Sequence, residues 1–139
     1  KADIRGLEAE LQAEFLDGRY NLEVATHWSR GNTRDDDAPI DDIPGVNLKF
    51  DLRRNLADSR GYAHMRVAVY LRDERPGPTE MVTPSFTTVD LGAGWRLSPN
   101  VELRGTVRNL FDTTYSVSPE IRAVFAPGIN AVIAIVGEF

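Results

Sequence analysis

The sequence lacks cysteine altogether and has only two histidines among its 139 residues. It therefore has no disulfide framework and no thiolate metal site, and little is left for a histidine-based one. It also lacks an excess of positive charge, because 21 acidic and 16 basic side chains give a net charge of −5. That balance argues against nucleic acid as a main partner. No run approaches the roughly eighteen consecutive apolar residues of a transmembrane helix, and the first residues do not resemble a signal peptide.

A helical period is missing as well, and glycine, proline, asparagine and aspartate cut the sequence into pieces of strand length. Several pieces are long: soluble strands average about five or six residues, whereas membrane-barrel strands need about nine to eleven. The sequence predicts an all-β chain, an antiparallel up-and-down meander of about seven strands. These strands are expected at residues 4–16, 19–30, 45–53, 61–72, 86–97, 100–109 and 128–139.

The connections between these strands alternate in length. Short ones fall at Asp17-Gly18, 55–60 and 98–100, and long ones at 31–44, 73–85 and 110–127. Short turns at one end and long loops at the other are typical of outer-membrane barrels. We expect the long loops to lie together at one end, and the short turns and Phe139 at the other.

The first hairpin gives the sharpest structural prediction. Asp17-Gly18 is a strong type I′ turn signal between alternating segments. A two-residue turn there places Phe15 opposite Tyr20 and Leu11 opposite Val24. A slip by one residue would turn the glutamates of the first strand toward the apolar side.

The alternation separates an apolar from a polar face along the remaining strands. We expect the apolar side chains to face lipid: Val46, Leu48, Phe50, Leu52, Ala63, Met65, Val67, Val69, Leu71, Val89, Leu91, Ala93, Trp95, Leu97, Val101, Leu103 and Val107. The polar face suits a wet barrel lumen and equally suits the solvated face of a soluble sheet. Strand length favours the membrane barrel, as do the aromatic residues expected to form its girdles: Phe15, Tyr20, Trp28 and Trp95.

The end of the chain carries Val107-Arg108-Asn109-Leu110-Phe111-Asp112, then Tyr115, Ala126-Pro127-Gly128 and a final strand ending at Phe139. This pattern resembles the close of TonB-dependent outer-membrane receptors, with their Asn-Leu-Phe-Asp…Tyr motif, Pro-Gly turn and C-terminal aromatic. Gly6-Leu7-Glu8-Ala9-Glu10 and the segment 39–45 are weaker likenesses upstream. Ile129 departs from the family, which usually has arginine there, and this puts an anion contact at that corner in doubt.

The resemblance implies that residues 1–139 are the C-terminal part of a 22-stranded transmembrane barrel. The plug domain and the N-terminal barrel strands would then be absent from this chain. The implied location is the bacterial outer membrane. The implied partners are outer-membrane lipid and lipopolysaccharide, the rest of the same receptor, the TonB energy-coupling complex through the absent part, and the β-barrel assembly machinery, for which Phe139 resembles the recognised terminus.

The candidate ligand contacts lie in the expected loops and on the polar face. Arg72, Arg108 and Arg122 suit an anionic siderophore, although structural ion pairs explain them too, and His27 fits either a ligand contact or an ordinary lumen residue. Arg5 and Arg30 could meet lipopolysaccharide phosphates or extend to the membrane surface by snorkelling. The acidic loop at Asp35, Asp36 and Asp37, with Asp41 and Asp42, could bind Ca²⁺ through its oxygens, although its spacing is not that of an EF-hand and a solvated extracellular loop explains it too. We expect no metal site and no cofactor.

By resemblance, the predicted function is energy-coupled uptake of a scarce ligand such as a ferric siderophore. The alternatives are a passive pore or structural barrel, and a soluble β-sandwich binding module. An enzyme is not expected, because no Ser–His–Asp set falls in a plausible arrangement.

Overall fold

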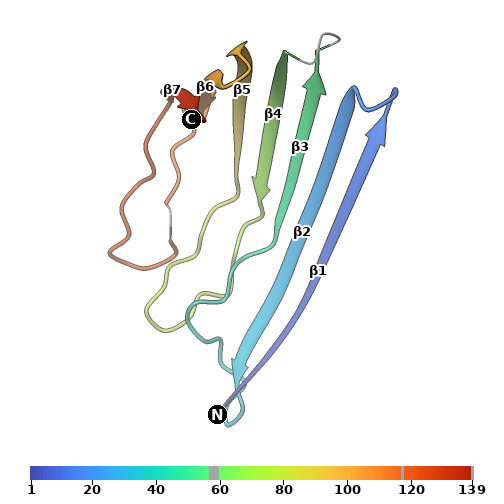
Figure 1. Cartoon of the computed structure of the whole chain (residues 1–139). Helices are drawn as coiled ribbons and strands as arrows, with labels where there is room; N and C mark the ends of the chain where they lie inside the picture. Colours follow the sequence, from blue (N-terminus) through green and yellow to red (C-terminus); the bar gives the residue numbers. More distant parts are fainter. Residues whose placement is uncertain (57–59, 117, 139) are drawn as a thin grey trace.

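The computed structural model describes residues 1–56, 60–116 and 118–138, which form one antiparallel sheet (Figure 1). Its seven strands lie side by side in sequence order, which confirms the predicted meander. No helix occurs in the described ranges, so they contain no helix that could cross a membrane. The strands are β1 (Ala2–Phe15), β2 (Tyr20–Thr33), β3 (Asn47–Asn55), β4 (Gly61–Tyr70), β5 (Phe86–Ser98), β6 (Val101–Arg108) and β7 (Asn130–Gly137).

The strand ends differ from the prediction by a few residues. The ladder between β1 and β2 continues to the pair Ala2 and Thr33, so the first hairpin is longer than expected. β4 is shorter, since it ends at Tyr70 and places Leu71 and Arg72 in the following loop. There the Leu71 amide donates a hydrogen bond to Val46 O (2.9 Å). Just beyond it, Asp73 forms an isolated bridge with Thr83.

The register of the first hairpin is the predicted one, with Phe15 opposite Tyr20 and Leu11 opposite Val24. Asp17 and Gly18 have positive φ angles of 55° and 77°, and Arg19 N donates to Leu16 O (3.2 Å). These features agree with a type I′ turn. Leu16 also has a positive φ of 53°, which the sequence did not indicate.

The strand pairing gives the sheet two chemically different faces. One continuous row joins Leu11, Val24, Phe50, Val67 and Val89 from β1 to β5. Directly opposite residues share a face, so the residues of β3 to β6 that were predicted to face lipid lie on this apolar face. β7 is an exception to the division into an apolar and a polar face. Its apolar residues Val132, Ala134 and Val136 pair with polar-face residues of β6 and therefore lie on the polar face.

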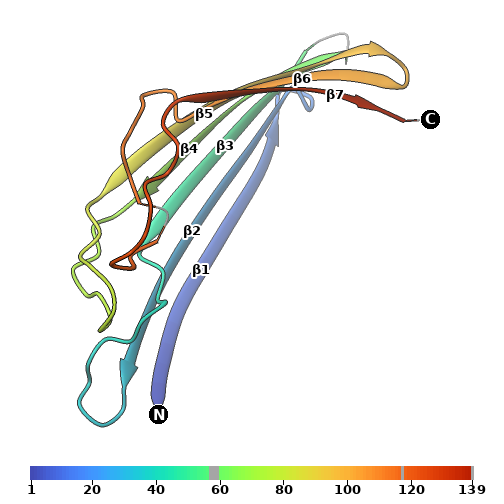
Figure 2. The same ribbon diagram turned by 90° about the vertical axis from the view of Figure 1, so that its left-hand side faces the viewer.

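The sheet has almost no interior of its own. Ala68 is the one buried apolar side chain in the described part of the chain. On the apolar face Leu7 is 60% exposed and Ile133 78% exposed. The sheet twists and curves along its width, so that β7 runs at a steep angle to β1 (Figure 2). It is therefore a curved wall whose apolar face requires an apolar environment.

Candidate functional site

The three long loops, 34–46, 71–85 and 109–129, gather at one end of the sheet, opposite the short turns (Figure 1). This confirms the predicted placement of loops and turns, and Phe139 lies outside the described residues. The first two loops are joined through carboxylates. Glu80, which is buried, accepts bonds from Asp42 N (2.9 Å) and Gly77 N (2.8 Å), and Asp41 accepts one from Thr79 N (2.9 Å).

The loop 109–129 is tied to its neighbour and to itself. Met81 N donates to Pro119 O (2.9 Å), and Glu80 and Glu120 form an isolated bridge. At its start, the buried Asn109 donates through Nδ2 to Thr113 O (2.9 Å) and Pro127 O (3.4 Å). The three loops are therefore one connected layer over the end of the sheet.

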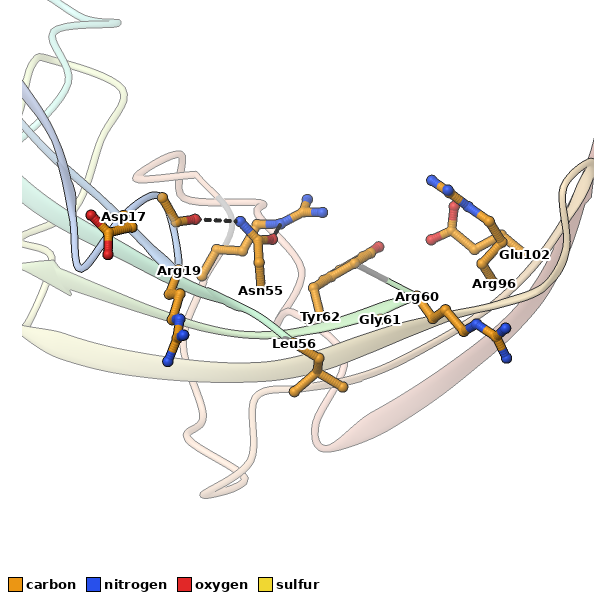
Figure 3. A pocket seen from close by; sticks show the side chains of 11 residues that line it. Asp17, Arg19, Asn55, Leu56, Arg60, Gly61, Tyr62, Arg96 and Glu102 are labelled. Atoms are coloured by element: carbon orange, nitrogen blue, oxygen red, sulfur yellow. Dashed lines mark hydrogen bonds between the residues drawn. The ribbon is translucent and has the colours of Figure 1, made fainter. Parts of the chain in front are cut away.

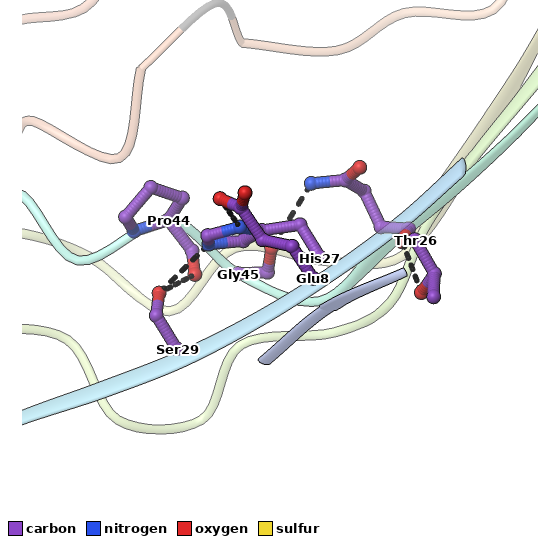
Figure 4. A network of polar contacts seen from close by, with 7 residues as sticks. Glu8, Thr26, His27, Ser29, Pro44 and Gly45 are labelled. Atoms are coloured by element: carbon purple, nitrogen blue, oxygen red, sulfur yellow. Dashed lines mark hydrogen bonds and ion pairs between the residues drawn. The ribbon is translucent and has the colours of Figure 1, made fainter. Parts of the chain in front are cut away.

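Beneath this layer, His27 holds a polar network on the polar face of β2 (Figure 4). Its Nδ1 lies 3.0 Å from Glu8 Oε1, and its Nε2 lies 3.0 Å from Ser29 Oγ. Ser29 Oγ in turn donates to Pro44 O (3.1 Å), at the end of the first long loop. The network thus links the edge strand β1, through β2, to the loop layer.

Aromatic rings occupy the same level on the neighbouring strands. Tyr70 and Phe86 are directly opposite each other and stack with ring centroids 4.5 Å apart. Tyr115, from the third long loop, stacks on Phe86 at the same centroid distance of 4.5 Å. Next to them is a hollow of about 330 Å³, lined by Asn47 and loop residues as well as Tyr70 and Phe86. A hollow of this size, lined by aromatic rings and by polar side chains such as Asp42 and Asp73, suits a small ligand.

A second hollow of about 440 Å³ lies at the short-turn end (Figure 3). Arg53 lies over the Tyr62 ring, with Cζ 3.7 Å from the centroid, and donates through Nε to Asn55 Oδ1 (3.0 Å). Glu102 and Arg96 lie side by side at its far side (Figure 3). Tyr62 lies flat on the wall because its partner is Gly94, where an added Cβ would come within 2.4 Å of Tyr62 Cε1.

The predicted ligand contacts are not brought together. None of the hydrogen bonds or ion pairs among the described residues joins two of the four. Arg72 pairs with Glu74 at 3.1 Å, Arg108 is the exposed last residue of β6, and Arg122 is exposed in the third loop. His27 alone belongs to a network that reaches the loop layer.

The acidic segment at residues 35–37 is a capped turn. The Thr33 hydroxyl donates to Asp36, and Asn32 donates to Asp37. The bond from Thr33, followed by that from Ala38 N, lowers the pKa of the Asp36 carboxyl. Among the described residues, no three His, Asp or Glu side chains converge into a metal site.

The predicted girdle residues lie on the apolar face at both ends of the strands. Phe15 and Tyr20 stack at 5.4 Å by the first short turn. Trp95 lies over Gly61 at the same end, where an added Cβ would come within 2.5 Å of Trp95 Cε3. Trp28 lies nearer the long loops and is 43% exposed.

Several functional groups were missed by reading the sequence. Tyr70 has the parity of the polar face, but its stack with Phe86 and Tyr115 depends on strand register and on the path of the third long loop. Glu80 gave no local signal, since both its hydrogen-bond partners lie in folded loops. The site offers hydrogen bonds, ring faces and charges, which are the means of non-covalent binding.

A family model described as "TonB dependent receptor-like, beta-barrel" matches residues 1–110. The solved structure named "Copper transporter OprC" is similar, with a TM-score of 0.88 and 21% sequence identity over 99% of this chain. The chain spans 24% of that structure's length, and the likeness at this identity shows the fold alone. No curated protein sequence matches the chain.

Proposed function

Because the chain belongs to the TonB-dependent receptor-like β-barrel family, we propose that it forms part of the wall of a receptor for energy-coupled uptake of a scarce ligand. The family places the chain in a bacterial outer-membrane barrel. The observation that carries the proposal is the two-faced sheet capped by a connected loop layer. Its apolar row from Leu11 to Val89 suits lipid, and its polar face holds charges of both signs.

In this proposal the chain supplies the last strands of the barrel, and the rest of the same receptor supplies the plug and the other strands. The loop end faces the outside and makes the first contact with ligand, while the TonB complex acts on the plug. His27, Arg72, Arg108 and Arg122 are the proposed ligand contacts, and the stack of Tyr70 and Phe86 is added to them. No covalent step is required.

A ferric siderophore is the first candidate ligand, since exposed arginines at the loop end suit an anionic chelate. A metal cation is the second candidate. The three long loops contain ten acidic and four basic residues, so this part of the entrance attracts cations. The copper named in the similar structure supports the same candidate.

Two further partners belong to the proposal. Phe139 is proposed as the aromatic terminus read by the β-barrel assembly machinery. Exposed apolar side chains such as Leu11, which is 59% exposed, are proposed to contact outer-membrane lipid.

Uptake in cells tests the function. The gene carrying this segment is disrupted and restored, and entry of radioactive iron as a panel of ferric siderophores is compared with entry of radioactive copper. We expect uptake of one ligand to be lost on disruption and on adding a protonophore. Uptake that persists with the protonophore would show a passive pore instead.

A charge reversal tests the proposed contacts. Arg108→Glu or Arg122→Glu should weaken uptake of an anionic chelate without loss of the barrel, because each reverses a charge at the entrance. Arg19→Glu, at the short-turn end, is the control. Unchanged uptake in both loop variants would remove these arginines from the site.

A further inference from the structure

The hollow of about 330 Å³ beside the aromatic stack is lined by residues of all three long loops and of the polar face. Tyr70 supplies its flat surface. In the paired strands, Tyr70 has Asn47 on one side and Phe86 on the other. Phe86 covers one face of the Tyr70 ring, with the centroids 4.5 Å apart. The other ring face is therefore turned toward Asn47, which also lines the hollow, and a flat group placed there would extend the stack.

The charged groups that border this hollow are both acidic. Asp42 from the first long loop and Asp73 from the second line it, and none of its described lining residues is lysine, arginine or histidine. None of the ion pairs in the described part of the chain includes either aspartate. A ligand group in the hollow therefore meets negative charge that no neighbouring cation pairs with, which favours a positively charged ligand.

The arginines of the second long loop are engaged elsewhere. Arg72 and Arg75 line a neighbouring hollow of about 190 Å³ instead. Arg72 pairs with Glu74 at 3.1 Å, and Arg75 Nη2 donates to Asn32 Oδ1 (3.0 Å). An anionic chelate in the hollow beside Tyr70 would therefore meet like charge rather than a guanidinium group.

The backbone at both aspartates is held by contacts within the loop layer. Asp42 N donates to the buried Glu80 (2.9 Å). Asp73 and Thr83 exchange two backbone hydrogen bonds, of 2.9 and 3.1 Å. The two carboxylates thus extend from ordered positions, and less conformational freedom is lost when a ligand binds between them and the ring.

We infer that this hollow binds an organic cation that carries a flat ring. The ring stacks on the uncovered face of Tyr70, and the cationic group pairs with Asp42 or Asp73. The inference rests on the proposed function, because it names the class of ligand that the entrance takes up. A bare metal ion would use the carboxylates but not the ring face, and among the described residues no three acidic or histidine side chains converge to hold one.

Binding of probes that share one ring but differ in charge tests the inference. The full receptor chain that carries this segment is purified in detergent and titrated by calorimetry with 1-naphthylmethylammonium, 1-naphthylmethanol and 1-naphthoate. We expect the cation to bind about tenfold or more tightly than the alcohol, the effect of one charge-assisted contact, and the anion to bind most weakly. Equal affinities for the cation and the alcohol overturn the inference in favour of uncharged ligands. Tightest binding of the anion overturns it in favour of an anionic chelate.

A double substitution tests the two carboxylates. Asp42→Asn with Asp73→Asn removes both charges and keeps the side-chain shape, and asparagine tolerates the φ of 63° that Asp42 adopts. We expect the affinity for the ammonium probe to fall to that for the alcohol. The matched control is Asp35→Asn with Glu74→Gln, which removes one exposed carboxylate from each of the same two loops outside the hollow and should leave the preference for the cation unchanged. An equal loss in both double variants overturns the inference in favour of the general field of the loops.

A substitution of Tyr70 tests the ring. Tyr70→Leu should weaken binding of all three probes because the stacking surface is lost, whereas Tyr70→Phe should retain it. Heat-dependent migration on gels verifies that each variant forms its barrel. Displacement of the ammonium probe by micromolar copper(II), with no effect of Tyr70→Leu, overturns the inference in favour of a metal site. These titrations need no energy coupling, so their failure removes the cation site alone, whereas uptake that persists with the protonophore removes the proposed function.

Discussion

Asn109 connects the two ends of the third long loop through its side-chain amide. Its φ of 51° places it in the left-handed region, where asparagine is tolerated better than most residues. Its amide joins the start of the loop to Thr113 and to Pro127 near the end. The Asn-Leu-Phe-Asp segment that marked the family resemblance is therefore a loop anchor in this structure.

Replacing Asn109 by alanine should destabilise the loop by about 1–3 kcal/mol, because half-buried backbone groups of Thr113 lose their partner. Limited proteolysis of the receptor should show faster cleavage within residues 109–129. Asn130→Ala is the control, since its exposed amide makes one short-range bond to Gly128 O (2.9 Å). Equal cleavage rates in the two variants would contradict the anchoring role.

Asp36 gives a pH-dependent prediction in the first long loop. The bonds from Thr33 and Ala38 favour the ionised carboxylate, so the pKa of Asp36 is lower in the folded turn than in an unfolded chain. The stabilisation is present above the ordinary aspartate pKa and is lost as pH falls through the lowered one. Carbon NMR should show the Asp36 titration shifted upward in Thr33→Val. An unchanged midpoint would exclude the hydroxyl as the main cause.

Strand β1 shows how parity fixes the environment of adjacent positions. Leu11 lies on the apolar face and Gln12 on the polar face, near the middle of the same strand. Leu11→Arg should lower the free energy of unfolding in lipid by about 2–4 kcal/mol, whereas Gln12→Arg should have little effect. Urea titration of the reconstituted receptor measures both. Equal effects would contradict the assignment of the lipid face.

The loop elements act together through Glu80. Glu80→Ala leaves the amides of Asp42 and Gly77 without their carboxylate. Bonds to charged groups are worth about 1.5–3 kcal/mol, so exchange of these amides with deuterium should accelerate by about ten- to a hundredfold. Glu74→Ala is the control, because that carboxylate pairs with Arg72 at an exposed site. If both variants exchange alike, the two loops are not joined by Glu80.

At the scale of the whole molecule, the chain is a single sheet with almost no buried interior. β1 and β7 are the edge strands of the sheet, and the apolar face is covered by nothing in the described chain. Open edges and a large apolar face promote association. Residues 1–139 made alone should therefore aggregate in buffer and disperse in detergent, as measured by sedimentation. A stable monomer in buffer would favour the soluble sandwich.

Local sequence determined most of this architecture. Asp17-Gly18 and the alternation around it set the first register, since a slip by one residue reverses every side chain. The same period of two assigns Leu48, Met65 and Trp95 to one face independently of any tertiary contact. Lipid contacts one face of such a sheet and the lumen contacts the other, so the residue type at each position indicates which face it occupies.

Contacts between distant segments were decided by the tertiary structure alone. Glu80 finds Asp42 across two loops, and Tyr115 reaches Phe86 from a third. The opposition of Arg5 and Arg30 follows from the register, but the engagement of Asp3 by Arg34 does not. The physical reason is that loop paths have no period. Their contacts depend on the backbone hydrogen bonds and ion pairs that form when segments far apart in sequence meet, and no repeat along the chain encodes those meetings.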